Sequence, residues 1–158
     1  LALDEAAVAA CSPWRFSAPL SPDQAAALEG RSLDLADLVG WCRAQIAGTR
    51  EGTLLIEGVG GLMSPVTETA TGLDWLRALG VPAVLVSGSY LGAISHALTA
   101  CETLRLHAVP LLAVAVSESE GAPAPASTVA GAIARHAGAP VFCLRRDEPC
   151  PDSLADLI

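Results

Sequence analysis

The residues with the clearest chemical potential lie in the stretch Thr53–Pro65, where an apolar run gives way to glycines. The run Thr53–Ile56 is typical of a buried strand, and Glu57 follows it directly. An acid at the end of an apolar strand is costly unless it faces a cleft in which water or a cation meets it. Gly58 and Gly60, which have no Cβ, let the backbone come close to a ligand. The pattern fits either an acid that binds Mg²⁺ or a nucleotide, or a strand-to-loop turn that merely exposes Glu57.

A second candidate site lies at Leu91–His96, where the predicted strand Ala83–Ser87 leads through small residues into a helix. The first N–H groups of a helix are free, and the helix dipole adds positive potential, so a carboxylate or phosphate is attracted there. Ser95 or His96 would add a side-chain donor. The alternative is that Ser95 caps the helix and His96 packs within its first turn, and these residues by themselves favour that alternative.

Other polar residues follow strands or end helices without a clear chemical role. Four of them follow a strand, where they either line the same crevice or form a solvated loop: Ser117, Glu118, Ser119 and Glu120. His107 and His136 fall near helix ends, where a cation suits the dipole, so we interpret them as surface or capping residues. No Ser/His/Asp set is recognisable. A GxxxxGK[ST] motif is absent because the 158 residues contain no lysine.

The elements that must position these residues alternate between strand and helix. Helices are predicted at about 1–11, 21–30, 34–47, 71–79, 93–106 and 127–136, and strands at 53–56, 83–87, 111–116 and 140–144, followed by an irregular tail. Three of these helices have predicted N-terminal caps: a capping box of Ser21 and Gln24, a cap at Asp34, and a capping arrangement of Thr71 with Asp74. The strands are continuously apolar, which is typical of parallel strands covered on both faces. No internal repeat or long linker divides the chain. We therefore predict a single α/β domain over residues 1–158, a three-layer α/β/α sandwich with a mostly parallel sheet.

Composition argues against several classes of function. The formal net charge is −8 and all nine basic residues are Arg, without a basic cluster, so a nucleic-acid partner is not expected. No apolar run is long enough to cross a bilayer, so a membrane partner is not expected either. The five cysteines are odd in number and form no C-x-x-C pair. We therefore expect buried thiols in a reducing cytoplasm in place of disulfides or zinc ligands.

Four segments, in the same order along the chain, resemble the dethiobiotin synthetase family. They are Ser12–Pro22, Glu57–Val66, Pro82–Val86 and Leu91–His96. The resemblance implies a P-loop NTPase-like α/β fold and a homodimer with active sites near the subunit interface. It also implies Mg·ATP-dependent closure of a ureido ring on 7,8-diaminononanoate with CO₂, in biotin biosynthesis. In that family a substrate amine becomes a carbamate, the γ-phosphoryl group of ATP activates it, and the second amine attacks.

The resemblance also implies roles for individual residues. Glu57 would bind Mg²⁺. The ATP-binding residues would be Glu57, Gly58, Val59 and Gly60 near the phosphates, and Ser117 and Glu118 near the base. The substrate carboxylate would be received by Gly92, Ala93, Ile94 and Ser95. No catalytic residue is assigned within the 158 residues, because the family's catalytic lysines would precede Leu1.

The sequence departs from the family pattern at several positions. Ser117-Glu118 stands where the family has Asn-Asp, so recognition of the base is expected to be weakened or changed. Ser95 stands where the family has Asn, and it keeps one hydrogen-bond donor. Asp23 stands where the family has His, and Arg145-Arg146-Asp147 replaces an Ile-Pro-Trp-like segment.

Under the leading hypothesis, the chain is the C-terminal part of a longer dethiobiotin synthetase whose Walker A segment precedes Leu1, and these residues alone are inactive. Two other functions stay open. A catalytically inactive relative would act as a nucleotide-binding or scaffolding module, in which the missing lysines are genuine losses. Another P-loop ATPase, of the partition or cobyrinate-amidation type, would share the sheet but is not expected to combine Glu57–Pro65 with Leu91–His96.

Overall fold

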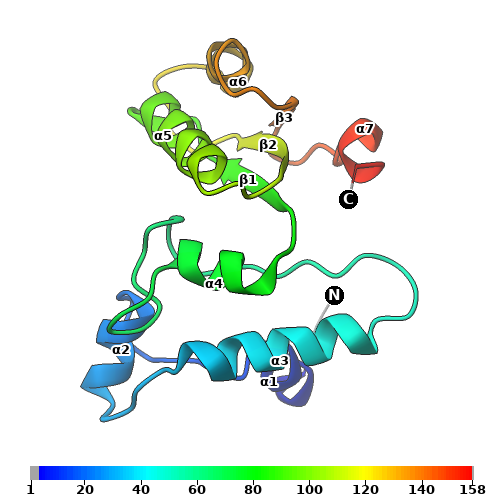
Figure 1. The fold of residues 1–158 in the computed structure, drawn as a ribbon. Coiled ribbons are helices and arrows are strands. Elements are labelled where there is room, and N and C mark those ends of the chain that lie inside the picture. Colours follow the sequence, from blue (N-terminus) through cyan, green and yellow to red (C-terminus); the bar gives the residue numbers. More distant parts are fainter. Residues whose placement is uncertain (1–3, 158) are drawn as a thin grey trace. The chain divides into compact units, whose positions relative to one another are not determined.

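The computed structural model describes residues 4–157, which form two compact units (Figure 1). The first unit comprises Leu1–Gly48 and Leu54–Trp75, and the second comprises Thr49–Thr53 and Leu76–Ile158. The prediction of one domain over residues 1–158 concerns how these units pack together, and it stays a prediction.

The first unit is helical. It contains α1 (Glu5–Cys11), α2 (Pro22–Leu28), α3 (Leu35–Gly48) and the first residues of α4 (Gly72–Leu79). Asp34 caps α3 as the sequence predicts, because its carboxylate accepts hydrogen bonds from the N–H groups of Ala36 and Asp37 at 2.7 and 3.2 Å. These bonds satisfy donors that have no partner within the helix.

The start of α2 is predicted correctly, but its capping box is not. Ser21 precedes the helix and Pro22 is its first residue, where proline's missing N–H costs nothing. The predicted box with Gln24 is wrong, since no side chain caps α2. The Ser21 hydroxyl donates instead to the carboxylate of Asp23, which replaces the family's His.

A small apolar core joins α3 to the loop that precedes α4. Leu38, Val66 and Ala70 are buried there, and the side chains packed against them are Trp14, Leu35 and Trp75. Trp14 also meets Trp41 edge to face, with ring centroids 5.9 Å apart, the arrangement that aromatic quadrupoles favour. The proline-rich segment 12–20 is thereby attached to α3.

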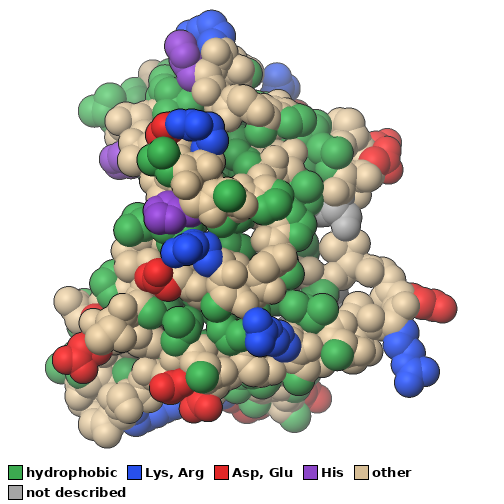
Figure 2. Space-filling view, in the orientation of Figure 1, with side chains coloured by type: hydrophobic (Ala, Val, Ile, Leu, Met, Phe, Trp, Pro, Cys, Tyr) green, Lys and Arg blue, Asp and Glu red, His purple; other side chains and the backbone are tan. Residues whose placement is uncertain are grey.

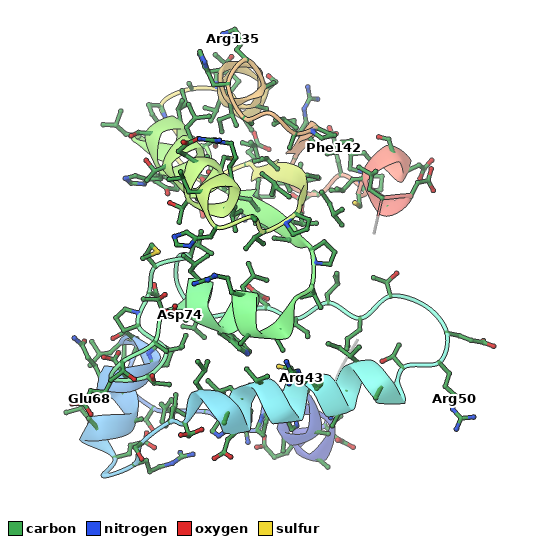
Figure 3. The ribbon with its side chains drawn as sticks, in the orientation of Figure 1. Arg43, Arg50, Glu68, Asp74, Arg135 and Phe142 are labelled. Atoms are coloured by element: carbon green, nitrogen blue, oxygen red, sulfur yellow. The ribbon has the colours of Figure 1, made fainter. Side chains whose placement is uncertain are left out.

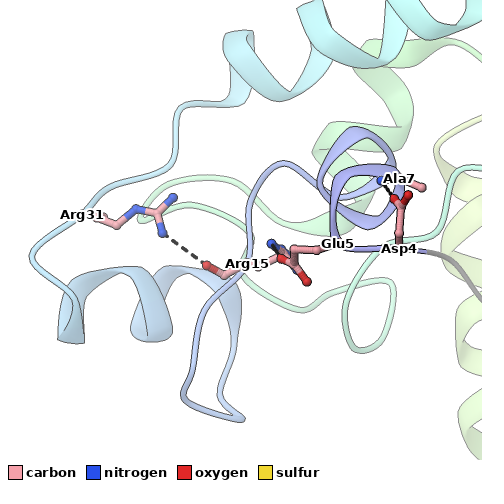
Figure 4. A network of polar contacts seen from close by, with 5 residues as sticks. All are labelled: Asp4, Glu5, Ala7, Arg15 and Arg31. Atoms are coloured by element: carbon pink, nitrogen blue, oxygen red, sulfur yellow. Dashed lines mark hydrogen bonds and ion pairs between the residues drawn. The ribbon is translucent and has the colours of Figure 1, made fainter.

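Arg31 holds the residues that follow Trp14 in that segment. Its guanidinium lies 4.7 Å from the ring centroid of Phe16 and donates to the backbone carbonyl of Arg15 at 3.2 Å (Figure 4). Arg15 in turn forms an exposed ion pair with Glu5 of α1, and its hydrogen bond lowers the pKa of the Glu5 carboxyl. Because the Arg15–Glu5 pair is exposed, it adds little to the free energy of unfolding, and its main effect is to fix the position of segment 12–20.

The predicted buried strand at Thr53–Ile56 is wrong. Residues 53–58 have no regular secondary structure, and Leu54 and Leu55 are 40% and 71% exposed. A strand exists only where a neighbouring strand accepts and donates its backbone hydrogen bonds, and residues 54–56 belong to no β-ladder within the described part of the chain. An apolar run is therefore not sufficient to make a strand.

The second unit is a parallel sheet covered by helices. Its strands are β1 (Ala83–Ser87), β2 (Leu111–Ser117) and β3 (Val141–Leu144), hydrogen-bonded in the order β1-β2-β3. Its helices, besides the end of α4, are α5 (Ala93–Leu106), α6 (Ala126–Ala134) and α7 (Asp152–Ala155). Apart from α7, which occupies the predicted irregular tail, these elements lie close to the predicted ranges.

Alternation along β2 explains why both faces of this sheet are covered. Val114 and Val116 point to a core formed with α5 and α6, whereas Ala113 and Ala115 point to the opposite face, against Leu154 of α7. Figure 1 shows α5 and α6 on one side of the sheet and α7 on the other. All four strand residues are fully buried. The predicted α/β class with a parallel sheet is thus confirmed, and this unit has three layers.

Charged side chains of both signs are spread over the visible surface. On the face shown in Figure 2, arginines are interspersed with acidic and hydrophobic side chains. Positive potential is therefore not concentrated on that face. Within residues 4–157, no helix has the length and apolarity needed to cross a bilayer.

The structure predicts unequal reactivity of the cysteines. Burial raises the pKa of the Cys42 and Cys101 thiols, so at pH 8 less thiolate is present and access is blocked, whereas Cys11 and Cys150 are exposed. In the folded protein, alkylation followed by peptide mass spectrometry should label Cys11 and Cys150 at least about tenfold faster than Cys42 and Cys101. Equal rates in the native protein would contradict this packing, and equal rates in denaturant serve as the control.

Candidate functional site

Glu57 lies in the first unit, at the end of the extended segment. Its side chain is exposed, and no hydrogen bond or ion pair with another described residue involves it. The carboxylate is therefore available to a ligand. No group of three or more His, Cys, Asp or Glu side chains within residues 4–157 is arranged to hold a metal ion. Glu57 thus offers one oxygen-donor residue, which suits Mg²⁺ that takes its other ligands from water and phosphates.

The glycine loop after Glu57 has a defined conformation. Gly60 has φ +79°, and a Cβ there would lie 2.3 Å from the Ser64 hydroxyl oxygen, so only glycine fits. That hydroxyl accepts a hydrogen bond from the N–H of Gly61 at 2.9 Å, and the Ser64 N–H donates to the Gly61 carbonyl at 2.9 Å. The close approach at Gly60 is to Ser64 within the loop, and the predicted approach of this backbone to a ligand stays a prediction. Val59, which lies between Gly58 and Gly60 in the chain, is 61% exposed.

The same loop is attached to the start of α4. The N–H groups of Gly72 and Leu73 donate to the carbonyls of Ser64 and Leu62 at 3.0 and 2.8 Å. Gly72 also has no room for a side chain, since a Cβ would lie 2.9 Å from the Leu62 carbonyl oxygen. The backbone after Glu57 is therefore held at two points along the loop.

A capping arrangement fixes the first turn of α4, as the sequence predicts. The N–H and the hydroxyl of Thr71 both donate to the Asp74 carboxylate, at 2.8 and 2.7 Å, and Figure 3 shows Asp74 on this helix. The ring of Trp75, one residue further on, lies against Gly58, where a Cβ would be 3.5 Å away. Helix α4 thus supports the loop that carries the residue next to Glu57.

The N-terminal tip of α5 is open to solvent. Gly92 is the N-cap with φ +97°, and no side chain caps the helix. The N–H of Ala93 donates to the carbonyl of Tyr90 at 3.1 Å, but the N–H groups of Ile94 and Ser95 donate to no acceptor among the described residues. Ser95 is exposed and is not the cap. Two free donors and the helix dipole therefore face outward together.

His96 packs against the first turn, as its alternative interpretation holds. Its ring lies over Gly92, where a Cβ would be 3.5 Å from its Cε1 atom. Nδ1 shares a hydrogen bond with the Tyr90 hydroxyl, at 3.0 Å. His96 therefore packs beside the N-terminal tip of α5, where its ring is hydrogen-bonded to Tyr90.

An apolar groove adjoins the tip of α5. It has a volume of about 870 Å³, and the apolar side chains lining it include Tyr90, Leu91, Ile94, Leu98, Pro123 and Ala124. Leu91 is 87% exposed and Tyr90 is 45% exposed, which is unusual for large apolar side chains beside free backbone donors. The arrangement suits a ligand with an anionic head and an aliphatic body.

Ser117 and Glu118 lie at the carboxyl end of β2, in the same unit as the α5 tip. Ser117 is exposed. Glu118 is half-buried, and its carboxylate accepts a hydrogen bond from the Arg146 N–H at 3.0 Å, so the replaced tail segment meets it through the backbone. The Arg145 guanidinium forms an exposed ion pair with Glu148.

Sequence reasoning missed the contact that joins these two regions. Ser89 and Ser119, thirty residues apart, each accept a hydrogen bond from the backbone N–H of the other. Serine carries no pairing signal in a sequence, so only the register of β1 and β2 could have suggested the contact. His107, by contrast, is the C-cap of α5, as predicted, and His136 follows α6.

The chain was compared with known proteins. A family model described as an AAA domain matches residues 1–144. An ATP-dependent dethiobiotin synthetase BioD of Methylobacterium nodulans is 65% identical over 152 residues, which are 96% of this chain and 68% of that protein. Proteins of the same name from Caulobacter sp. (strain K31) and Acidiphilium cryptum are 49% and 47% identical, over 92% and 89% of this chain.

This chain belongs to the dethiobiotin synthetase family. It spans 63% to 68% of the length of these three relatives. The family resemblance carried by Glu57–Val66 and Leu91–His96 is thereby confirmed, and so is the P-loop NTPase-like fold class.

The loop geometry predicts a local effect of Ser64. Ser64→Ala removes the acceptor of the Gly61 N–H, a net loss of about 1 kcal/mol, so exchange of the Gly61 amide should quicken about fivefold. Amide hydrogen exchange by NMR measures this rate. Ser32→Ala, at an exposed residue of the same unit, should leave the Gly61 rate unchanged. An unchanged Gly61 rate in Ser64→Ala would contradict the described loop.

Proposed function

We propose that the full-length protein is a dethiobiotin synthetase that uses Mg·ATP and CO₂ to close the ureido ring of 7,8-diaminononanoate. Family membership supports the reaction type. The observation that carries the proposal is the α5 tip, where the free N–H groups of Ile94 and Ser95 adjoin an apolar groove.

The α5 tip matches the chemistry of this substrate. Diaminononanoate has a carboxylate at one end and a methylene chain behind it. The carboxylate would accept hydrogen bonds from the two free N–H groups, with the exposed Ser95 hydroxyl as a further donor. Gly92 and Ala93 would set the approach to these donors, and the apolar groove wall would take methylene groups, at about 0.8 kcal/mol for each one buried.

Glu57 and its loop match the nucleotide end of the reaction. The free carboxylate of Glu57 would be one ligand of Mg²⁺, and Gly58, Val59 and Gly60 would border the phosphates of ATP. When bound, Mg·ATP supplies the γ-phosphoryl group that activates the carbamate. The hydrogen bonds within the loop support this role, because phosphoryl transfer depends mainly on positioning and charge neutralisation.

Ser117 and Glu118 would lie near the base of ATP. The Ser117 hydroxyl is exposed and offers one donor and one acceptor in place of the family's amide side chain. The Glu118 carboxylate offers acceptors only, and one of its oxygens is already bound by the Arg146 N–H. Base recognition through these two side chains would accordingly be less specific than through Asn-Asp.

We also propose a cytoplasmic homodimer in which the two units of the chain form one domain. The large exposed side chains of Leu91 and Tyr90 support an interface beside the α5 tip. An interface there agrees with active sites near the subunit boundary.

The proposed Mg²⁺ ligand gives the decisive activity test. In the full-length protein, Glu57→Gln should lower kcat at least about 100-fold at saturating substrates, because the charge stabilisation supplied through the metal is worth several kcal/mol. Glu51→Gln, at an exposed acid six residues earlier in the chain, is the matched control and should stay within about twofold of wild type. Production of dethiobiotin is the readout.

Two outcomes would contradict the proposal. Wild-type activity in Glu57→Gln would remove Glu57 from the metal site. Tight binding of Mg·ATP and diaminononanoate by the wild-type full-length protein without turnover would favour the inactive binding module.

A further inference from the structure

We propose that Ser89 and Ser119 form a reciprocal clamp that positions the α5 tip relative to the loop after β2. The proposal rests on the proposed function, in which the first of these regions receives diaminononanoate and the second lies near the base of ATP. Ser89 and Ser119 are positioning residues, since neither is placed against a substrate.

The clamp consists of two crossed hydrogen bonds. The N–H of Ser89 donates to the Ser119 hydroxyl oxygen at 3.0 Å, and the N–H of Ser119 donates to the Ser89 hydroxyl oxygen at 2.9 Å. Ser89 is 1% exposed, so its hydroxyl is shielded from water and makes its hydrogen bonds within the protein. Each hydroxyl satisfies a backbone donor that the ends of the parallel ladder leave unpaired. Two loops that separate strands β1 and β2 from their helices are thereby joined.

Close packing around the clamp leaves little freedom. A Cβ on Gly88 would lie 2.6 Å from the Ser119 hydroxyl oxygen and 2.7 Å from Cδ1 of Tyr90. Any residue larger than glycine at position 88 would have to displace the clamp or the tyrosine ring. Gly88, Ser89 and Tyr90 therefore pack together with Ser119.

Bonds on either side of the clamp reach both ligand regions. Towards α5, the Tyr90 carbonyl accepts from the Ala93 N–H at 3.1 Å, and the Tyr90 hydroxyl pairs with His96. Towards β3, the N–H of Glu118 donates to the Leu144 carbonyl at 2.8 Å, and its carboxylate binds the Arg146 N–H. The clamp is the link between these two sets, and it joins the α5 tip to Glu118 across the strand ends.

The expected consequence is for substrate affinity. The α5 tip would bind the carboxylate end of the substrate, and ligand binding weakens when the receiving donors are no longer held in place. Loss of the clamp loosens the α5 tip without removing any of its donors. KM for diaminononanoate should therefore rise while kcat, once the substrate is bound, changes little.

The test uses full-length Ser89→Ala, Ser119→Ala and the double variant. Because each hydroxyl serves the other residue's amide, Ser89→Ala should quicken hydrogen exchange at the Ser119 amide, and Ser119→Ala at the Ser89 amide, each about fivefold. KM for diaminononanoate should rise about three- to tenfold in each single variant, with kcat within about twofold. The double variant should be no worse than the more affected single variant, because the two bonds act together.

Ser153→Ala is the matched control, since it removes an exposed serine hydroxyl of α7, in the same unit and outside the groove. It should leave both amides and KM unchanged. If Ser89→Ala fails to fold, Ser119→Ala carries the test at a half-buried position. An active wild type with unchanged KM in the folded Ser variants, or with additive KM effects in the double variant, overturns the clamp alone. A wild type without turnover overturns the proposed function and with it the role of the clamp.

Discussion

Parallel pairing of β1, β2 and β3 is the constraint on which the second unit depends. Parallel strands cannot be joined by tight turns, so the chain must return through α5 and α6 between them. All three strands then end at the same edge of the sheet, and the segments that follow them meet there. This is why Ser89, Glu118 and Arg146, far apart in sequence, belong to one set of contacts. Ligand crevices of α/β sheets lie at this edge.

Small buried side chains let the helices pack closely against both faces of this sheet. Ala113 and Ala115 are fully buried, so α7 can approach the sheet closely through Leu154. On the opposite face, Ala93, Ala97 and Ala130 let α5 and α6 pack near the strands. Because the side chains are small, the backbones of the helices lie close to those of the strands, and close packing then fixes the positions of the helices. The α5 tip is therefore placed by its buried residues, and its outer donors are left free.

The sequence predicted the elements of the second unit well because their signals are local. Helix α5 begins at Ala93, directly after Gly92, and ends at Leu106, and the apolar run Leu111–Val116 is a strand with partners on both sides. The same kind of run failed at Thr53–Ile56, because pairing depends on a neighbour that a local pattern does not contain. Glu57 was recognised as a free acid, whereas the contact between Ser89 and Ser119 was invisible, since it arises only from strand register.

The central claim is that the free N–H groups at the start of α5 receive the substrate carboxylate. The most direct measurement is a crystal structure of the full-length protein with bound diaminononanoate. We expect the carboxylate oxygens within about 3 Å of the backbone nitrogens of Ile94 and Ser95, in either subunit of a dimer. A carboxylate bound elsewhere, with these N–H groups open to solvent, would contradict it.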